Sequence, residues 1–152
     1  MSLTALQASA YLHHLHFYTP APERLSKWYA IAMNMEVESL SGDLWLTTGP
    51  SRLVLFSKGE AKKLSHAGFA VRDAESLQGL RERAEQRGLT PRSVETPLFQ
   101  PGAFGVTDPD GNAIYFGLAP FFLGYFHRPH RFGNIVRSIV ELTEFSTSLG
   151  QI

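Results

Sequence analysis

The sequence contains no cysteine among its 152 residues. Disulfide bonds, thiolate nucleophiles and cysteine-ligated zinc are therefore excluded, and the absence agrees with the cytoplasmic location that we expect. Neither sign of charge is in excess, because 14 basic residues balance 14 acidic ones. A neutral chain of this kind gives no reason to expect nucleic acid or a membrane surface as its partner.

Long apolar runs are also missing. No stretch approaches the roughly 18 apolar residues of a membrane span, and the N-terminus lacks the basic region and apolar run of a signal peptide. The composition is nevertheless that of a folded globular protein, since 43% of the residues are hydrophobic and 18% are charged. The length suits one domain with a real core.

Residues 12–56 predict a β-α-β-β-β repeat. A strand over residues 12–19 places three polar aromatic side chains on one face, those of His14, His16 and Tyr18. Pro22 followed by Glu23 predicts the start of a helix. The apolar stripe expected to form the core side of that helix is Leu25, Trp28, Tyr29 and Ala32. Short runs between turn residues predict three further strands, at 35–40, 44–48 and 52–56.

Residues 64–118 predict a second repeat with the same order. A strand begins near His66, and Asp73 is a suitable N-cap for a helix whose stripe is Leu77, Leu80 and Ala84 and whose end is near Gly88. Residues 92–96 suggest a short strand. Residues 104–107 and 113–118 predict a hairpin, because the turn Asp108-Pro109-Asp110-Gly111 has proline at its second position and glycine at its fourth.

The two repeats can be aligned by a fixed offset. His66 lies 52 residues after His14 (66 − 14), and the same offset places Leu77 on Leu25, Leu80 on Trp28 and Ala84 on Ala32. We therefore expect an α+β fold of two paired βαβββ repeats within residues 1–118. Residues 119–152 are either a truncated third repeat, with Asn134 in the place of His14, or a tail that packs on the body or on another subunit.

This ordered set resembles the vicinal oxygen chelate superfamily, which contains glyoxalase I, bleomycin-resistance proteins and type I extradiol dioxygenases. The residues that carry the resemblance are His14 with Trp28-Tyr29, His66 with Val71-Arg72-Asp73, and Asp108 to Asn112. The layout is most similar to the N-terminal domain of a two-domain extradiol ring-cleavage dioxygenase, a half that commonly lacks a complete metal site. The resemblance implies a cupped mixed sheet with the helices outside.

The resemblance also implies a metal site. In that superfamily the ligands come from the first strand of each repeat and from a glutamate on the last strand, which correspond here to His14, His66 and Tyr115. Two imidazoles and a carboxylate hold Fe(II). A phenol with a pKa near ~10 is a poor substitute for that carboxylate at neutral pH, although tyrosinate does bind iron in some proteins.

Two main functions follow as expectations. One is an extradiol-dioxygenase-like protein that holds a catechol-like ligand in the cup against His16 and Tyr18. With Fe(II) or another divalent metal bound, such a protein would be a ring-cleaving enzyme. The other is a metal-free module that sequesters small molecules, as bleomycin-resistance proteins do. A third reading is a structural or regulatory half-domain that acts through residues 120–152. We expect a homodimer and a small aromatic partner, and the resemblance places the chain in the catabolism of aromatic compounds.

Overall fold

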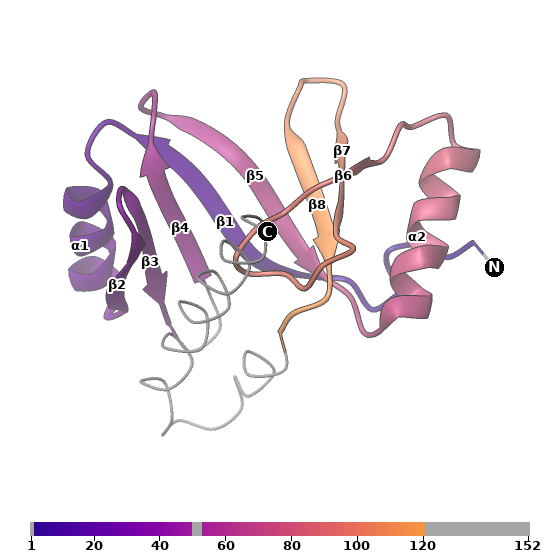
Figure 1. The fold of residues 1–152 in the computed structure, drawn as a ribbon, viewed down its shortest axis with the longest axis horizontal. Helices are drawn as coiled ribbons and strands as arrows, with labels where there is room; N and C mark the ends of the chain where they lie inside the picture. Colours follow the sequence, from indigo (N-terminus) through magenta and orange to yellow (C-terminus); the bar gives the residue numbers. More distant parts are fainter. Residues whose placement is uncertain (1, 50–52, 121–152) are drawn as a thin grey trace, which may run out of the picture. The chain divides into compact units, whose positions relative to one another are not determined.

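The computed structural model describes residues 2–49 and 53–120. Within these residues, two helices and eight strands follow one another as two β-α-β-β-β repeats (Figure 1). The expected α+β class is confirmed. From residue 121 on, the segment assigned to a third repeat or tail lies outside the described residues, as do residues 50–52. None of the helices in the described part is long and apolar enough to cross a membrane.

The elements lie close to where the sequence predicts them. The first repeat consists of β1 (Tyr11–Thr19), α1 (Pro22–Met33), β2 (Glu36–Ser41), β3 (Leu44–Thr48) and β4 (Leu53–Lys58). The second consists of β5 (Lys63–Ala70), α2 (Ala74–Gln86), β6 (Arg92–Ser93), β7 (Phe104–Thr107) and β8 (Ala113–Gly117). The strand predicted over residues 92–96 is shorter than expected, with two residues.

The chain divides into two compact units that share β1. The first, here called the histidine unit, comprises Met1–His16 and Leu64–Pro120; the second, the α1 unit, includes Phe17–Lys63. Strands in the histidine unit lie in the order β1-β5-β8-β7-β6. The pairing of β5 with β8 is parallel, whereas β8 with β7 and β7 with β6 are antiparallel, so the sheet is mixed. Its curvature into a cup stays a prediction.

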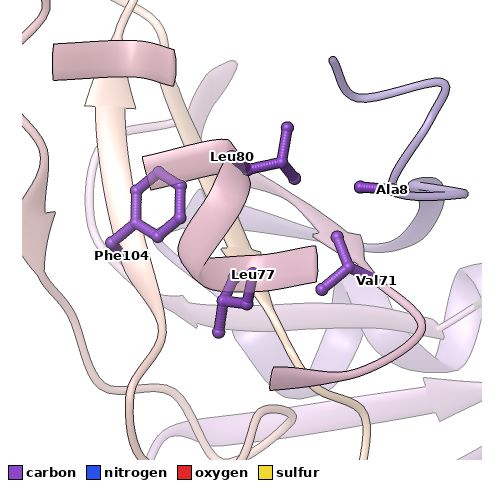
Figure 2. Close-up of a cluster of buried hydrophobic side chains, with 5 residues drawn as sticks. All are labelled: Ala8, Val71, Leu77, Leu80 and Phe104. Carbon is purple, nitrogen blue, oxygen red and sulfur yellow. The ribbon is translucent and has the colours of Figure 1, made fainter. Parts of the chain in front are cut away.

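Helix α2 covers one face of the sheet in the histidine unit. Leu77 and Leu80 pack with Val71 and Phe104, and Ala8 from the N-terminal lead-in completes this buried cluster (Figure 2). The Asp73 carboxylate accepts a hydrogen bond from the Ser76 backbone N–H at 2.8 Å, so the predicted N-cap is confirmed. Burial of these apolar side chains stabilises the unit. Because α2 covers this face of the sheet, the candidate site lies on the opposite face.

In the α1 unit, the strand order is β2-β3-β4-β1 and α1 contacts β2, β3 and β4. The core consists mainly of β3 and β4 side chains, and both Leu55 and Phe56 are fully buried. Tyr29 faces this core, with its ring centroid 5.3 Å from that of Phe56. The prediction that Trp28 belongs to the core is wrong, because its side chain is 60% exposed.

The inward face of α1 differs from the predicted stripe for a steric reason. The buried residues of the helix are Pro22 and Ser26, which with Tyr29 lie on one face at spacings of four and three residues. A small residue at the contact lets the helix approach the strands closely, and the Ser26 hydroxyl is satisfied by donating to the Glu23 carbonyl at 2.9 Å. Trp28 and Ala32 are therefore turned towards solvent.

The repeats diverge after their helices. Pro22 and Ala74, the first residues of α1 and α2, differ by 52 (74 − 22), but the first residues of β4 and β8, Leu53 and Ala113, differ by 60 (113 − 53). The second repeat thus carries eight additional residues. They fall in the connection between β6 and β7, which includes the buried residues Leu98 and Phe99.

Candidate functional site

The structure brings His14, His66 and Tyr115 together in the histidine unit. They lie on β1, β5 and β8, which are neighbours in the sheet. Tyr115 pairs with Gly68 in the parallel register of β8 and β5, and His66 lies two residues earlier on the same face of β5. The rings of His66 and Tyr115 are stacked, with centroids 3.9 Å apart and planes inclined by 13°.

The turn before β8 holds Tyr115 in this register. The Asp108 carboxylate accepts hydrogen bonds from the Asp110 and Asn112 backbone N–H groups at 3.0 and 2.8 Å. Gly111 adopts a φ of 88°, a left-handed conformation that favours glycine at the last position of this turn. The turn joins β7 to β8, and in this hairpin Gly105 pairs with Tyr115.

Both ring nitrogens of His14 are used in contacts with other histidines. Its Nε2 lies 2.9 Å from Nε2 of His66, and its Nδ1 lies 2.9 Å from Nδ1 of His13. Beyond His66, the Ser65 hydroxyl lies 3.3 Å from the remaining His66 nitrogen, Nδ1. These distances are those of hydrogen bonds. Ser65, His66, His14 and His13 therefore form one connected set, here called the imidazole chain.

His13 is the histidine of the imidazole chain that the sequence did not identify. Successive residues of a strand alternate between faces, which places His13 on the face opposite to that of His14. It is instead only 4% exposed, and its ring meets those of both His14 and Phe99, at centroid distances of 5.2 and 5.4 Å. Phe99 also contacts His14 at 4.9 Å, so the insertion between β6 and β7 supplies the aromatic cover for both histidines.

The other predicted ligand-binding residues are divided between the two compact units. The ring of His16 meets that of His66 edge to face, with centroids 5.1 Å apart. Tyr18 belongs to the α1 unit, where its ring packs against Gly59. A role in ligand binding stays a prediction for both residues.

Burial keeps the histidines of the site neutral. It lowers the pKa of His13 to about 4 and, together with the neighbouring imidazoles, lowers the pKa of His14 to about 2. Burial and then the positive form of His16 lower the pKa of His66 to about 3. At neutral pH each of these rings therefore carries one N–H donor and one acceptor nitrogen.

Three rings of the site rest directly on glycines, which leaves them little freedom to move. A Cβ on Gly68 would lie 2.2 Å from Cε1 of His14, and one on Gly105 would lie 2.8 Å from the Tyr115 ring. Gly117 supports Phe99 in the same way, with 2.5 Å to the ring. These distances are shorter than van der Waals contact, so the absence of a side chain at each position makes room for the ring.

The residues present do not fit the metal site that the resemblance implies. A metal on His66 Nε2 would lie in the imidazole plane, and a ligand oxygen must approach it to about 2.0–2.2 Å. Tyr115 lies in a nearly parallel plane, and stacked rings are separated by about 3.5 Å, so its oxygen is displaced from that position. Within the described residues, no three His, Cys, Asp or Glu side chains are grouped to hold a metal ion.

A separate hollow lies on the surface of the α1 unit. It is open, has a volume of about 550 Å³, and is lined by residues from 20 to 58, including Trp45 and the start of α1. Its charged residues partly offset one another, since Lys27 pairs with Glu23 at 2.6 Å and Lys58 with Asp43 at 4.0 Å. None of its lining residues belongs to the imidazole chain.

Two β-α-β-β-β repeats, each with a histidine on its first strand, make up this α+β fold, and the DPDGN turn precedes its last strand. Comparison with solved structures confirms the fold, which resembles that of extradiol dioxygenases. No protein-family model matches the sequence, and no curated protein matches it.

Catechol 2,3-dioxygenase superposes with a TM-score of 0.61 at 18% identity, over 72% of this chain and 41% of the dioxygenase. A variant of homoprotocatechuate 2,3-dioxygenase from Brevibacterium fuscum gives 0.60 at 15% identity, over 71% and 32% of the two chains. This chain therefore spans less than half the length of the dioxygenases that it resembles.

The shared fold does not fix the chemistry. A chain described as NAD-dependent benzaldehyde dehydrogenase from Legionella pneumophila gives a TM-score of 0.51 at 13% identity, over 70% of this chain and 98% of that one. Proteins with different named activities thus resemble this fold, and function must be argued from the site itself.

Proposed function

We propose that this chain is a small-molecule-binding module with an extradiol-dioxygenase-like fold, which holds a planar aromatic, catechol-like ligand beside the imidazole chain and does not itself cleave rings. The observation that carries the proposal is the stacking of Tyr115 on His66 at the position that the triad carboxylate would occupy. An aromatic wall favours a flat ligand, whereas ring cleavage by iron needs the anionic ligand that is missing.

His16, whose pKa is lowered by burial and which is therefore neutral at pH 7, supports a ligand with hydroxyl groups. An uncharged imidazole can accept a hydrogen bond from a phenolic hydroxyl and can donate one to a phenolic oxygen. Two of the structurally similar enzymes are named for catechol and homoprotocatechuate, which agrees with a ligand of this class. The half-exposed His16, next to His66, is the side chain that we expect to reach the ligand.

The proposal is tested by titrating chelator-treated protein with catechol and recording NMR spectra of the histidine and tyrosine rings. Saturable shifts of the His16, His66 and Tyr115 signals are expected, and cis-1,2-cyclohexanediol, which has the hydroxyls but no aromatic ring, should bind more weakly. Substitution Tyr115→Ala should weaken catechol binding by roughly 2- to 10-fold, the value of one aromatic contact. The exposed Tyr11→Ala variant is the matched control.

Two results would contradict the proposal. Absence of any saturable shift with catechol would remove the binding function. Oxygen consumption by the protein after addition of Fe(II) and catechol, beyond that of a His66→Ala variant, would show that the chain is a ring-cleaving enzyme after all.

A further inference from the structure

The nitrogen atoms of the imidazole chain face one another in pairs. His66 Nε2 and His14 Nε2 are 2.9 Å apart, and so are His14 Nδ1 and His13 Nδ1. Two imidazole lone pairs at this distance repel each other unless a hydrogen atom or a cation lies between them. Each of the two contacts therefore needs one proton, or the first of them needs a metal ion.

Neutral imidazoles leave two ways of placing these protons. A neutral ring has one N–H, so a ring that donates from one nitrogen must accept at the other. If His66 donates from Nε2, His14 accepts at Nε2 and donates from Nδ1 to His13, whose own hydrogen is then on Nε2. If His13 donates from Nδ1, every assignment is reversed. In both arrangements His14 carries its hydrogen on the opposite kind of nitrogen from His13 and His66.

We propose that His14 and His66 are joined by a proton rather than by a metal ion, and that His13, His14 and His66 form a hydrogen-bonded chain whose tautomers are coupled. His13 is then a positioning residue, because it determines which nitrogen of His14 carries the hydrogen. The two Nε2 atoms that would be metal ligands in this fold are committed to each other. A ligand that bonds one ring selects the arrangement of all three.

The packing of the site supports this assignment. His14 is 1% exposed and lies against Gly68, and His66 is 3% exposed and stacked on Tyr115. Phe99 contacts both His13 and His14. These contacts prevent the three imidazole rings from rotating towards other partners, so the nitrogen atoms of neighbouring rings continue to face one another. Each of the three rings is at most 4% exposed, and burial disfavours the charged imidazolium, which preserves the single hydrogen on which the coupling depends.

The test is the tautomer of each ring in the full chain labelled with ¹⁵N-histidine, recorded at pH 7 by long-range ¹H–¹⁵N correlation. The expected result is that His14 has the tautomer opposite to that of His13 and His66, with a scalar coupling across the hydrogen bond between the two Nε2 atoms. If His14 and His66 are both protonated on Nδ1, both Nε2 atoms are bare, as a shared metal requires, and the proposal is overturned. Addition of Zn²⁺ should leave the pattern unchanged.

A substitution separates coupling from simple packing. His13→Phe keeps an aromatic ring against Phe99 but removes the nitrogen that faces His14. The expected result is a changed tautomer ratio at His66, two links along the chain. Tyr11→Phe is the control, because Tyr11 meets the edge of the His13 ring at 6.2 Å but supplies no atom to the chain. If the His66 ratio is the same in His13→Phe as in the control, the tautomers are not coupled. If His13→Phe does not fold, the tautomer pattern of the unmodified chain still decides the question.

Discussion

The position of His14 depends on a glycine of the neighbouring strand. Its ring lies where the side chain of residue 68 would be, and a Cβ there would come within 2.2–2.6 Å of three ring atoms of His14. Since His14 is buried and bonded at both nitrogens, the ring has no open space into which to move. Gly68 is thus required by the site and not by the conformation of β5.

We predict that Gly68→Ala destabilises the protein by about 1–3 kcal/mol, the usual cost of inserting a methyl group into a packed region. The measurement is urea unfolding, repeated in a His14→Ala background. In that background the obstructing ring is absent, so the same Gly68→Ala change should cost less than ~1 kcal/mol. Equal costs in the two backgrounds would show that the His14 ring is not what excludes a side chain at position 68.

Tyr115 is the residue that separates this site from a two-histidine, one-carboxylate metal site. We predict that Tyr115→Glu increases affinity for Fe(II) or Zn²⁺ at least ~10-fold, because the new carboxylate and the two nearby imidazoles can then bind the metal together. Isothermal titration calorimetry with Zn²⁺ is the measurement. Tyr115→Gln is the matched control, with the same length and no charge. If Tyr115→Gln raises the metal affinity by the same factor, the gain comes from loss of the aromatic ring and not from the added charge.

The two helices begin differently, although they occupy equivalent places in the repeats. Helix α2 has the Asp73 cap, whereas Ala21, the N-cap of α1, offers no side-chain acceptor. The chain before α1 is held instead by the Ala21 backbone N–H, which donates to the Thr19 hydroxyl at 3.3 Å. The first N–H groups of α1 are therefore a place where stability can be added.

We predict that Ala21→Ser stabilises the protein by about 0.5–1 kcal/mol, because the new hydroxyl accepts from an N–H group of the first turn. Thermal unfolding followed by circular dichroism measures the effect. Ala32→Ser, the same change at an exposed position inside α1, should have the opposite sign and cost a few tenths of a kcal/mol. If both variants change stability in the same direction, the capping explanation is incorrect.

The helices and strands could be predicted where single residues have a strong structural preference, but less well where only hydrophobic spacing was available. Pro22 and Gly111, which have strict backbone preferences, and Asp73, which has a capping side chain, correctly indicated the helix starts and the final hairpin. Trp28 was misassigned because helical spacing shows that a helix has an apolar face but not which face turns inward. In α1 the small Ser26 permits the closer contact, and it has no hydrophobic signal of its own.

The residues of the candidate site could be predicted only where the two repeats correspond or where the family resemblance applies. The 52-residue offset related His14 to His66, and the resemblance to the vicinal oxygen chelate superfamily indicated Tyr115. His13 was missed because alternation assigns adjacent strand residues to opposite faces, yet both His13 and His14 are buried. Phe99 was missed because it lies in an insertion without periodicity and without a counterpart in the first repeat. Its role depends on tertiary contacts that local sequence does not encode.

For the whole molecule, the buried neutral histidines predict a marked sensitivity to acid. The ordinary pKa of histidine is 6.5, which also describes the unfolded chain, whereas the folded values are about 4 for His13, 2 for His14 and 3 for His66. Below pH 6.5 the unfolded chain binds protons that the folded protein does not. Stability from these residues is therefore fully present above pH 6.5 and is lost as the pH falls towards their folded values.

We predict that the free energy of unfolding falls by up to about 4 kcal/mol per pH unit between pH 6 and 4.5, since each of the three residues contributes about 1.4 kcal/mol per unit at full slope. Over this range the loss reaches about 6 kcal/mol at most, which exceeds only the low end of the usual total stability of about 5–15 kcal/mol. Urea unfolding at a series of pH values measures the slope, and His13→Phe should reduce it by about one third. The lowered pKa values of Asp73 and Asp108 affect stability only at more acidic pH, so they do not contribute to the slope in this range.

A slope near zero between pH 6 and 5 would mean that these histidines are protonated in the folded protein. The imidazole chain, which needs neutral rings, would then be excluded as well.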